Sequence, residues 1–169
     1  MAPRAVVVGP PGAGKTTVGQ LLAELWDVEF RDTDVDVQRA AGKAIAEIFT
    51  HDGEDAFREL EEQAVQRALV EHDGVLALGG GAVVSERTRK LLIGYPVLYL
   101  SVGLAEGAQR TGLSTARPLL AGVNPRATFK ALLDARTPLY REVAAVELDT
   151  DGAAPEELVQ RAAGRLAPA

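Results

Sequence analysis

Five short apolar runs alternate along the chain with stretches of helical periodicity. The runs cover residues 5–8, 28–30, 75–78, 97–100 and 144–148. Between the first two runs, apolar residues recur at the i, i+3, i+4, i+7 spacing of one helix face, at Val18, Leu21, Leu22 and Leu25. Near-continuous apolar strands separated by helices are typical of a parallel sheet covered on both faces. The pattern therefore predicts an α/β fold with a five-stranded parallel sheet flanked by helices.

Helix boundaries leave further signals. A second helical pattern precedes the third apolar run, at Phe57, Leu60, Ala64 and Ala68. Ser85 is suited to cap a helix over residues 86–93, since serine is a favoured N-cap. Pro155 is suited to open the last helix, because proline is tolerated in the first turn.

Two segments fit this alternation poorly. Residues 31–72 require more than one helix between the second and third strands. Residues 112–125, GLSTARPLLAGVNP, contain two glycines and two prolines and show no clear period. Long irregular segments in compact domains are usually lids or binding loops. We therefore expect a substrate-binding segment at about residues 32–62 and a mobile lid at about residues 112–125.

Composition narrows the class of protein. A length of 169 residues predicts a single domain over residues 1–169. The net charge of −6 makes nucleic acid and anionic membranes poor partners. No cysteine is present, which excludes disulfides and zinc-thiolate sites, and two histidines are too few for a histidine metal centre. Since no signal peptide, membrane-spanning run or long apolar stripe is evident, we expect a cytoplasmic monomer.

The segment GPPGAGKTT at residues 9–17 matches the P-loop pattern, with a strand before it and a helix after it. Glycines let backbone N–H groups turn towards a phosphate, and the new helix adds its positive end. Lys15 can reach the outer phosphates of a nucleotide, and the Thr16 hydroxyl can ligate Mg²⁺. A glycine turn without a ligand is the alternative, but the strand–loop–helix context favours phosphate binding. The absence of an Asn-Lys-x-Asp segment argues against a GTPase.

Two carboxylates, Asp32 and Asp34, follow the second predicted strand, whereas the third strand ends in LALGGGAV without an acid. Loops at the carboxyl ends of parallel strands line one crevice, so both aspartates should meet the P-loop and Gly79–Gly81 there. One Asp can assist a metal ion through water, and the other can accept the proton of a substrate hydroxyl. Alternatively, Asp34 simply caps the following helix. We expect Asp36 to face solvent.

The glycine run and three arginines complete the candidate site. Three consecutive glycines cost backbone entropy, so close approach of a ligand is favoured over a merely flexible turn. Arg58 and Glu61 share a helix face, either as a solvated salt bridge or as a guanidinium held to grip a carboxylate. Arg136 ends a predicted helix before Pro138 and could be an ordinary C-terminal cation. Arg117, in the lid segment, is placed to fold over a transferring phosphate.

Taken together, these segments resemble the shikimate kinase family. The matching pieces are GPPGAGKTT, DTD, FR followed by Glu61, LGGGAV, RPLL and RTPLYREVA, which extend from residue 9 to about residue 145. The P-loop is shared by many families, but DTD, GGGAV and RPLL in this order are far more specific. The resemblance implies a nucleoside-monophosphate-kinase-like fold and ATP-dependent phosphorylation of the 3-hydroxyl of shikimate, within aromatic amino-acid biosynthesis.

The resemblance also implies a role for each candidate residue. Asp34, Lys15 and Arg117 would be catalytic, and Thr16 with Asp32 would serve Mg²⁺. The ATP-binding residues would be Gly12, Ala13, Gly14, Lys15, Thr16, Thr17, Arg110, Arg117 and Pro155. The shikimate-binding residues would be Asp34, Phe49, Phe57, Arg58, Glu61, Gly79, Gly80, Gly81, Leu119 and Arg136.

Two other functions compete with this interpretation. A related small-molecule kinase, such as a gluconate kinase, would share the P-loop and lid but has no obvious need for two arginines beside a glycine run. A non-catalytic nucleotide-binding module is the second alternative. Intact Lys15, Thr16, Asp34 and Arg117 argue against it, because loss of activity tends to be followed by loss of such residues.

Overall fold

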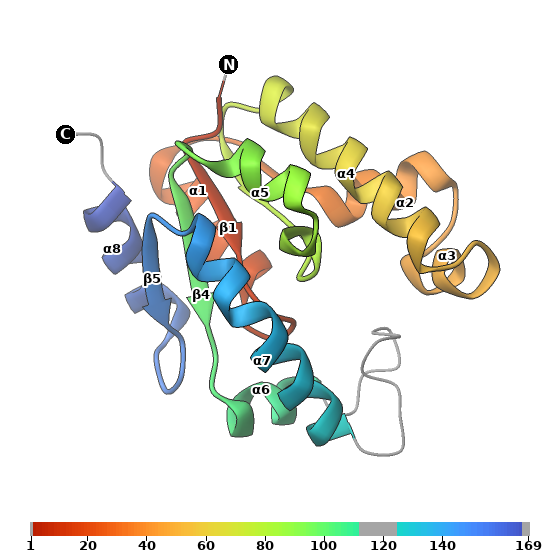
Figure 1. The fold of residues 1–169 in the computed structure, drawn as a ribbon. Coiled ribbons are helices and arrows are strands. Elements are labelled where there is room, and N and C mark those ends of the chain that lie inside the picture. Colours follow the sequence, from red (N-terminus) through yellow and green to blue (C-terminus); the bar gives the residue numbers. More distant parts are fainter. Residues whose placement is uncertain (1, 112–124, 167–169) are drawn as a thin grey trace.

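Five parallel strands form the centre of the molecule in the computed structural model, which describes residues 2–111 and 125–166 (Figure 1). Their order along the sheet is β2-β3-β1-β4-β5. The strands are β1 (Ala5–Val8), β2 (Phe30–Asp32), β3 (Val75–Ala77), β4 (Val97–Ser101) and β5 (Val146–Asp149). Every pairing is parallel, which confirms the five-stranded parallel sheet predicted from the apolar runs.

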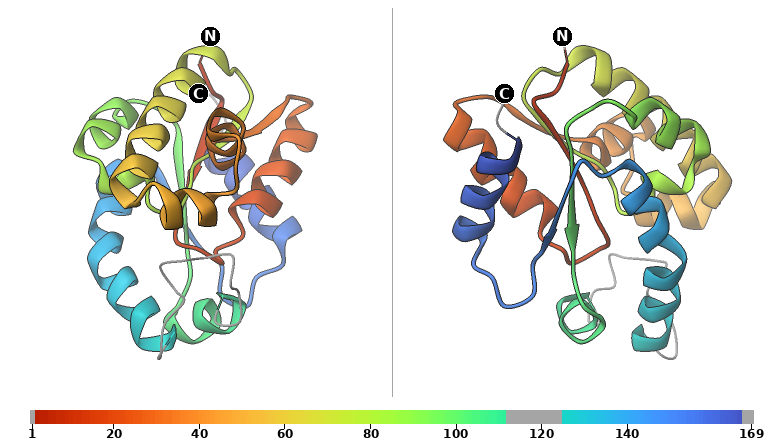
Figure 2. Two further views of the ribbon diagram at one scale, coloured as in Figure 1. Left: turned by 90° about the vertical axis from the view of Figure 1, so that its right-hand side faces the viewer. Right: turned by 60° about the vertical axis from the view of Figure 1, so that its left-hand side comes forward.

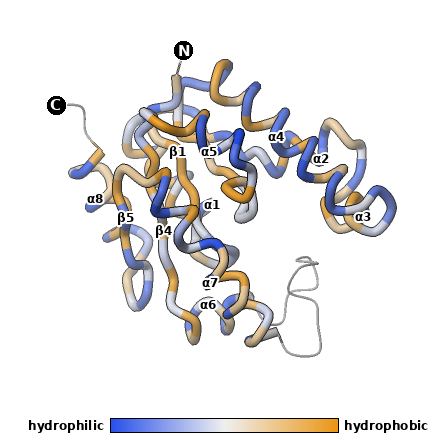
Figure 3. The backbone as a smooth tube through the Cα atoms, in the orientation of Figure 1, coloured by the Kyte–Doolittle hydropathy of each residue, from blue (hydrophilic) through white to orange (hydrophobic). Residues whose placement is uncertain are grey.

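Helices cover both faces of this sheet (Figure 2). One face carries α1 (Lys15–Trp26) and α8 (Pro155–Leu166), and the other carries α4 (Glu54–Glu71), α5 (Glu86–Leu92) and α7 (Pro125–Val143). Alternate residues of a strand point to opposite faces, so Val7 packs with the first group and Val6 with the second. Strand β1 is accordingly hydrophobic along its whole length (Figure 3).

The segment between β2 and β3 folds into three helices. These are α2 (Thr33–Ala41), α3 (Ile45–His51) and α4. They enclose a small core of their own around Val37, Ile48 and Phe57, which confirms that this segment holds more than one helix. The remaining elements are the 3₁₀-helix η1 (Ala82–Val84) and α6 (Leu104–Thr111). None of the described helices has the length and apolar character needed to cross a membrane.

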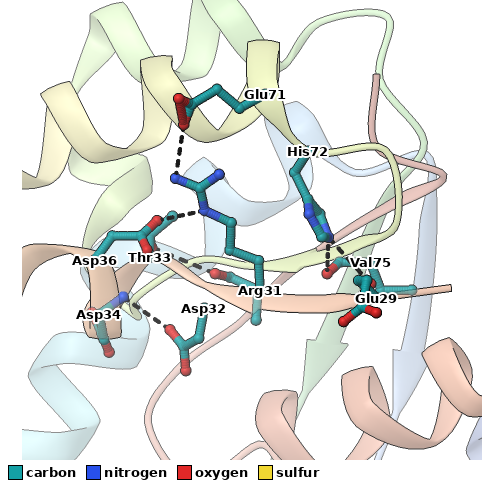
Figure 4. Close-up of polar contacts among 10 residues, drawn as sticks. Glu29, Arg31, Asp32, Thr33, Asp34, Asp36, Glu71, His72 and Val75 are labelled. Carbon is teal, nitrogen blue, oxygen red and sulfur yellow. Dashed lines mark hydrogen bonds and ion pairs between the residues drawn. The ribbon is translucent and has the colours of Figure 1, made fainter. Parts of the chain in front are cut away.

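Strand β2 lies two residues later than predicted. The Val28 N–H donates to Ala23 O at 2.9 Å, and Asp27 has a left-handed φ of 54°, so residues 27 and 28 terminate α1 instead of entering the sheet. Strand pairing begins only at Phe30, opposite Val75. His72 Nε2 lies 3.0 Å from Val75 O and 3.2 Å from Glu29 O, and it ties the entrances of the two strands together (Figure 4).

Helix α7 also differs from the prediction, because it continues through Pro138 to Val143. Arg136 therefore lies inside a helix, and its interpretation as a C-terminal cation was wrong. Strand β5 consequently starts at Val146, two residues after the predicted start. By contrast, the Ser85 side chain does cap α5, accepting from the Thr88 N–H at 3.1 Å, and Pro155 is the first residue of α8.

Candidate active site

The P-loop folds as its glycines require. Gly12 and Gly14 have φ values of 81° and 88°, a left-handed conformation that residues with a Cβ rarely adopt. Gly14 is the N-cap of α1, and no described side chain caps that helix. The Lys15 ammonium donates to Gly9 O at 2.8 Å and to Pro10 O at 3.0 Å, so it lies across the loop. The loop thus presents backbone N–H groups, a helix N-terminus and an ammonium to one space.

Asp32, not Asp34, is the N-cap of α2. Its Oδ1 accepts from the Asp34 N–H at 2.9 Å (Figure 4), so the interpretation of Asp34 as the helix cap was wrong. Burial raises the pKa of the Asp32 carboxyl, while the Asp34 N–H, the Lys15 charge and the Thr16 hydroxyl act in the opposite direction. The carboxylate that caps α2 is therefore the one that faces Thr16 and Lys15.

Asp36 does not face solvent as expected. Its Oδ2 accepts from Arg31 Nε at 2.8 Å, and the same guanidinium reaches Glu71 Oε1 at 3.1 Å (Figure 4). The Asp36 side chain is only 15% exposed. Arg31 thus joins the first turn of α2 to the end of α4. Asp36, for which no function was predicted, therefore has a structural role as an ion-pair partner of Arg31.

Two cavities meet at Thr16 and Asp32. One of about 300 Å³ is lined by the P-loop, Asp32 and Asp34, and the other, of about 640 Å³, lies along β2. Among the described residues, no group of three or more His, Cys, Asp or Glu side chains could hold a metal ion. A hydroxyl and one carboxylate beside open space suit Mg²⁺, because this ion keeps several waters and takes few protein ligands.

The glycine turn brings together three predicted substrate residues, Asp34, Arg58 and Glu61. A Cβ on Gly79 would lie 2.5 Å from Asp34 Oδ1 and 2.9 Å from Glu61 Oε2, and a Cβ on Gly81 would overlap the Arg58 guanidinium. Neither glycine has a positive φ, so the missing side chains provide space and not conformational freedom. The turn makes room for the protein's own charged groups, in addition to the ligand approach inferred from the sequence.

Arg58 and Glu61 form a largely buried ion pair. Arg58 Nη1 lies 2.7 Å from Glu61 Oε1, and Glu61 is 3% exposed, which excludes a solvated surface salt bridge. Burial raises the pKa of Glu61, and the Arg58 charge opposes that rise. Arg58 Nε is buried without a hydrogen-bond partner among the described residues, so they do not fully satisfy this guanidinium.

Arg136 enters the same group from α7. It is 8% exposed, and its charge acts on both Glu61 and Tyr140. Tyr140 donates a hydrogen bond from its hydroxyl to Gly80 O at 2.5 Å. We did not assign Tyr140 from the sequence. The signal was its position four residues after Arg136, on the same helix face, which the assumed helix end at Pro138 concealed.

The two predicted aromatic residues lie against each other, and Phe57 lies beside Arg58. The rings of Phe49 and Phe57 are 4.8 Å apart, and the Arg58 guanidinium lies 5.1 Å from the Phe57 ring centre. Phe57 is 4% exposed and belongs to the small core of α2–α4. Its buried ring is therefore a fixed surface against which Phe49 and Arg58 pack. Contact of either ring with a substrate stays a prediction.

Arg110 and Pro155 lie together at the far side of the P-loop. Arg110 Nη1 donates to Gly12 O at 2.8 Å, and its Nη2 pairs with Glu106 at 2.8 Å. Both residues line a cavity of about 230 Å³ with Ala13 and Thr17. The arrangement fits the nucleotide side of the site. Arg117, Leu119 and most of the predicted lid lie outside the described residues, and Pro125 already belongs to α7.

Comparison with known proteins identifies the family. The family model "Shikimate kinase" matches residues 11–167. A shikimate kinase of Saccharopolyspora erythraea is 74% identical, covering 98% of this chain and 95% of that relative, and one of Rhodococcus jostii is 53% identical, covering 99% of each chain.

Solved structures agree with this result. Shikimate kinase from Acinetobacter baumannii in complex with shikimate is 40% identical with a TM-score of 0.91, over 95% of this chain and 90% of that chain. A gluconokinase from Sinorhizobium meliloti, 19% identical with a TM-score of 0.61, over 96% of this chain and 90% of that chain, shares the fold alone. The parallel α/β fold, the P-loop and these sequence matches lead to one conclusion: the chain belongs to the shikimate kinase family.

Proposed function

We propose that this enzyme transfers the γ-phosphoryl group of ATP to the 3-hydroxyl of shikimate, giving shikimate 3-phosphate and ADP on the route to aromatic amino acids. The observation that carries the proposal is the meeting of Asp34 and Arg58 at Gly79–Gly81. A Cβ on Gly80 would lie 3.1 Å from Pro11 of the P-loop, so this turn adjoins the phosphate site. A hydroxyl acid would thus be placed directly beside a nucleotide.

The nucleotide would be held mainly by the P-loop. Backbone N–H groups at the start of α1 would bind the phosphates, and Lys15 would exchange its contacts with Gly9 O and Pro10 O for the outer phosphates. Arg110 and Pro155 would flank the base. Thr16 and Asp32 would hold Mg²⁺, which would neutralise charge on the phosphates.

Shikimate would be oriented by positively charged side chains at its carboxylate and by a negatively charged side chain at its reacting hydroxyl. The guanidinium groups of Arg58 and Arg136 would bind its carboxylate, with Glu61 fixing Arg58 in place. Asp34 would accept a hydrogen bond from the reacting hydroxyl and take its proton as the phosphoryl group arrives. Arg117 and Leu119 would close over the bound substrates. Positioning and charge neutralisation would carry most of the rate, because phosphoryl transfer needs little covalent chemistry from the protein.

The direct test is ADP release from Mg-ATP with shikimate, with gluconate, and with a shikimate analogue that lacks the 3-hydroxyl. We expect ADP release to rise strongly with shikimate alone, and ³¹P NMR to show a phosphate ester at the 3-position. Stimulation by gluconate would contradict the assigned acid. ATP binding without stimulation by any acid would favour the non-catalytic module.

The glycine turn offers a second test. In Gly81→Ala, the new Cβ would displace the Arg58 guanidinium, whose central carbon lies only 2.7 Å from its position. A charge-assisted hydrogen bond is worth about 1.5–3 kcal/mol, so we expect the KM for shikimate to rise about 10- to 100-fold with the KM for ATP little changed. Gly164→Ala is the matched control, because its Cβ would meet no described atom within 4 Å. An unchanged KM in Gly81→Ala would remove Arg58 from the carboxylate site.

We also propose, from the sequence, that the protein is a monomer, that it consists of one domain and that it is located in the cytoplasm. Sedimentation at several protein concentrations tests whether it is a monomer. A mass that grows with concentration would contradict it.

A further inference from the structure

The phenol of Tyr140 lies between β4 and the glycine turn, and the proposed mechanism gives it no role. The residue is fully buried in α7, and its ring stacks on Tyr99 of β4 with centroids 5.0 Å apart. Its hydroxyl donates to Gly80 O, the middle carbonyl of the glycine turn. Tyr140 therefore joins α7 directly to the turn that adjoins Asp34 and Arg58.

Arg136 lies one helical turn earlier on the same face of α7, and its charge acts on the Tyr140 hydroxyl. A phenol has one donor and acceptor lone pairs, so it can serve Gly80 O and a guanidinium at once. Burial raises the pKa of Tyr140 far above the neutral range, so the hydroxyl keeps its proton and its donor role. Tyr140 thus ties the part of α7 that carries Arg136 to the glycine turn.

We infer that Tyr140 is a positioning residue for shikimate, fixing Arg136 relative to Gly80 so that the guanidinium meets the substrate carboxylate. This inference rests on the proposed function. Tyr140 itself would touch neither substrate. Its effect would pass through the orientation of Arg136, and it should therefore appear in shikimate binding and not in ATP binding.

A general structural role would behave differently, because α7 has a second attachment to the same region. Arg89 of α5 pairs with Glu142 at 2.7 Å and donates to Val83 O of η1 at 2.8 Å. This attachment does not involve the phenol. Loss of the Tyr140 hydroxyl should therefore leave α7 docked while releasing the local constraint on Arg136.

The test is Tyr140→Phe, which keeps the ring and its stacking and removes only the hydroxyl. We expect the KM and the Kd for shikimate to rise about 5- to 10-fold, as for loss of one buried hydrogen bond, with the KM for ATP within about twofold of wild type. Tyr99→Phe is the matched control. It removes the other hydroxyl of the same stacked pair, which interacts with Thr137 of α7, and we expect its shikimate KM to stay at the wild-type value.

A double-mutant cycle with Arg136→Lys tests whether the effect passes through Arg136. We expect Arg136→Lys to raise the shikimate Kd by a smaller factor in the Tyr140→Phe variant than in wild type, because the arginine is already misplaced there. Additive effects, equal loss of ATP binding, or equal effects of Tyr99→Phe would each overturn the inference. Calorimetry of the wild type separates the two proposals, since failure to bind shikimate would reject the proposed function itself.

Discussion

Replacing Asp34 with asparagine should lower kcat for shikimate phosphorylation by about 10²- to 10⁴-fold, the usual contribution of a positioned general base. ATP binding should change little. The hydrogen bond from Asp34 to Asp32, the predicted metal residue, comes from the backbone N–H of Asp34, and the substitution keeps that group. The fold should persist as well. Asparagine is nearly isosteric, and loss of the Asp34 charge removes a repulsion that raises the pKa of Glu61. Steady-state kinetics with both substrates, beside thermal unfolding, measures these effects.

Asp36→Asn supplies the matched control for this experiment. It makes the same chemical change two residues along the same helix, at a carboxylate that pairs with Arg31 instead of facing Gly79. A partly exposed ion pair of this kind contributes about 1 kcal/mol or less, so kcat should stay near wild type. If Asp34→Asn retained normal turnover, Asp34 would have no place in the mechanism. A kcat for Asp34→Asn well above that of Asp34→Ala would indicate orientation of the hydroxyl in place of proton removal.

The fold was predictable from the sequence because its three central strands, β3, β1 and β4, are buried on both faces. Such strands read as uninterrupted apolar runs, and the P-loop fixed which of them begins the site. Errors arose where local and tertiary signals disagreed. Val28 resembles a strand residue, yet its N–H completes the end of α1. Pro138 resembles a helix stop, yet burial of Tyr140, which stacks on Tyr99 of β4, carries α7 past it.

The candidate site was predictable in its membership but not in its internal contacts. The spacing of Asp32 and Asp34 did not reveal which of them caps α2, since either position suits an N-cap. Nor could the three glycines show that their missing side chains make room for Asp34 and Arg58. Such contacts join α2, α4, α7 and the β3–η1 turn, and pairings between distant elements leave no periodic signal in one sequence.

Removal of Arg58 should have the second large effect, and the structure shows why one substitution cannot measure it cleanly. In Arg58→Met, we expect the KM for shikimate to rise about 100-fold, because a charged hydrogen-bonding partner of the carboxylate is lost. The same change leaves the buried Glu61 without its ion-pair partner, with only the charge of Arg136 acting on it, and breaking such a pair costs about 3–5 kcal/mol of folding free energy. Burial already raises the pKa of Glu61, so without Arg58 the folded state would favour the protonated carboxyl. Stability should then fall as pH rises above the ordinary pKa of a glutamate.

The double variant Arg58→Met/Glu61→Gln separates substrate binding from stability. Glutamine carries no charge to bury, so the unfolding free energy and its pH dependence should return towards the wild-type values. The KM for shikimate should stay high, because the cation is still missing. Urea unfolding at several pH values, together with kinetics, measures both quantities for the single and double variants. If the double variant regained a normal KM for shikimate, the apparent binding defect of Arg58→Met would be a consequence of the uncompensated Glu61, and the carboxylate would be held by Arg136 without Arg58.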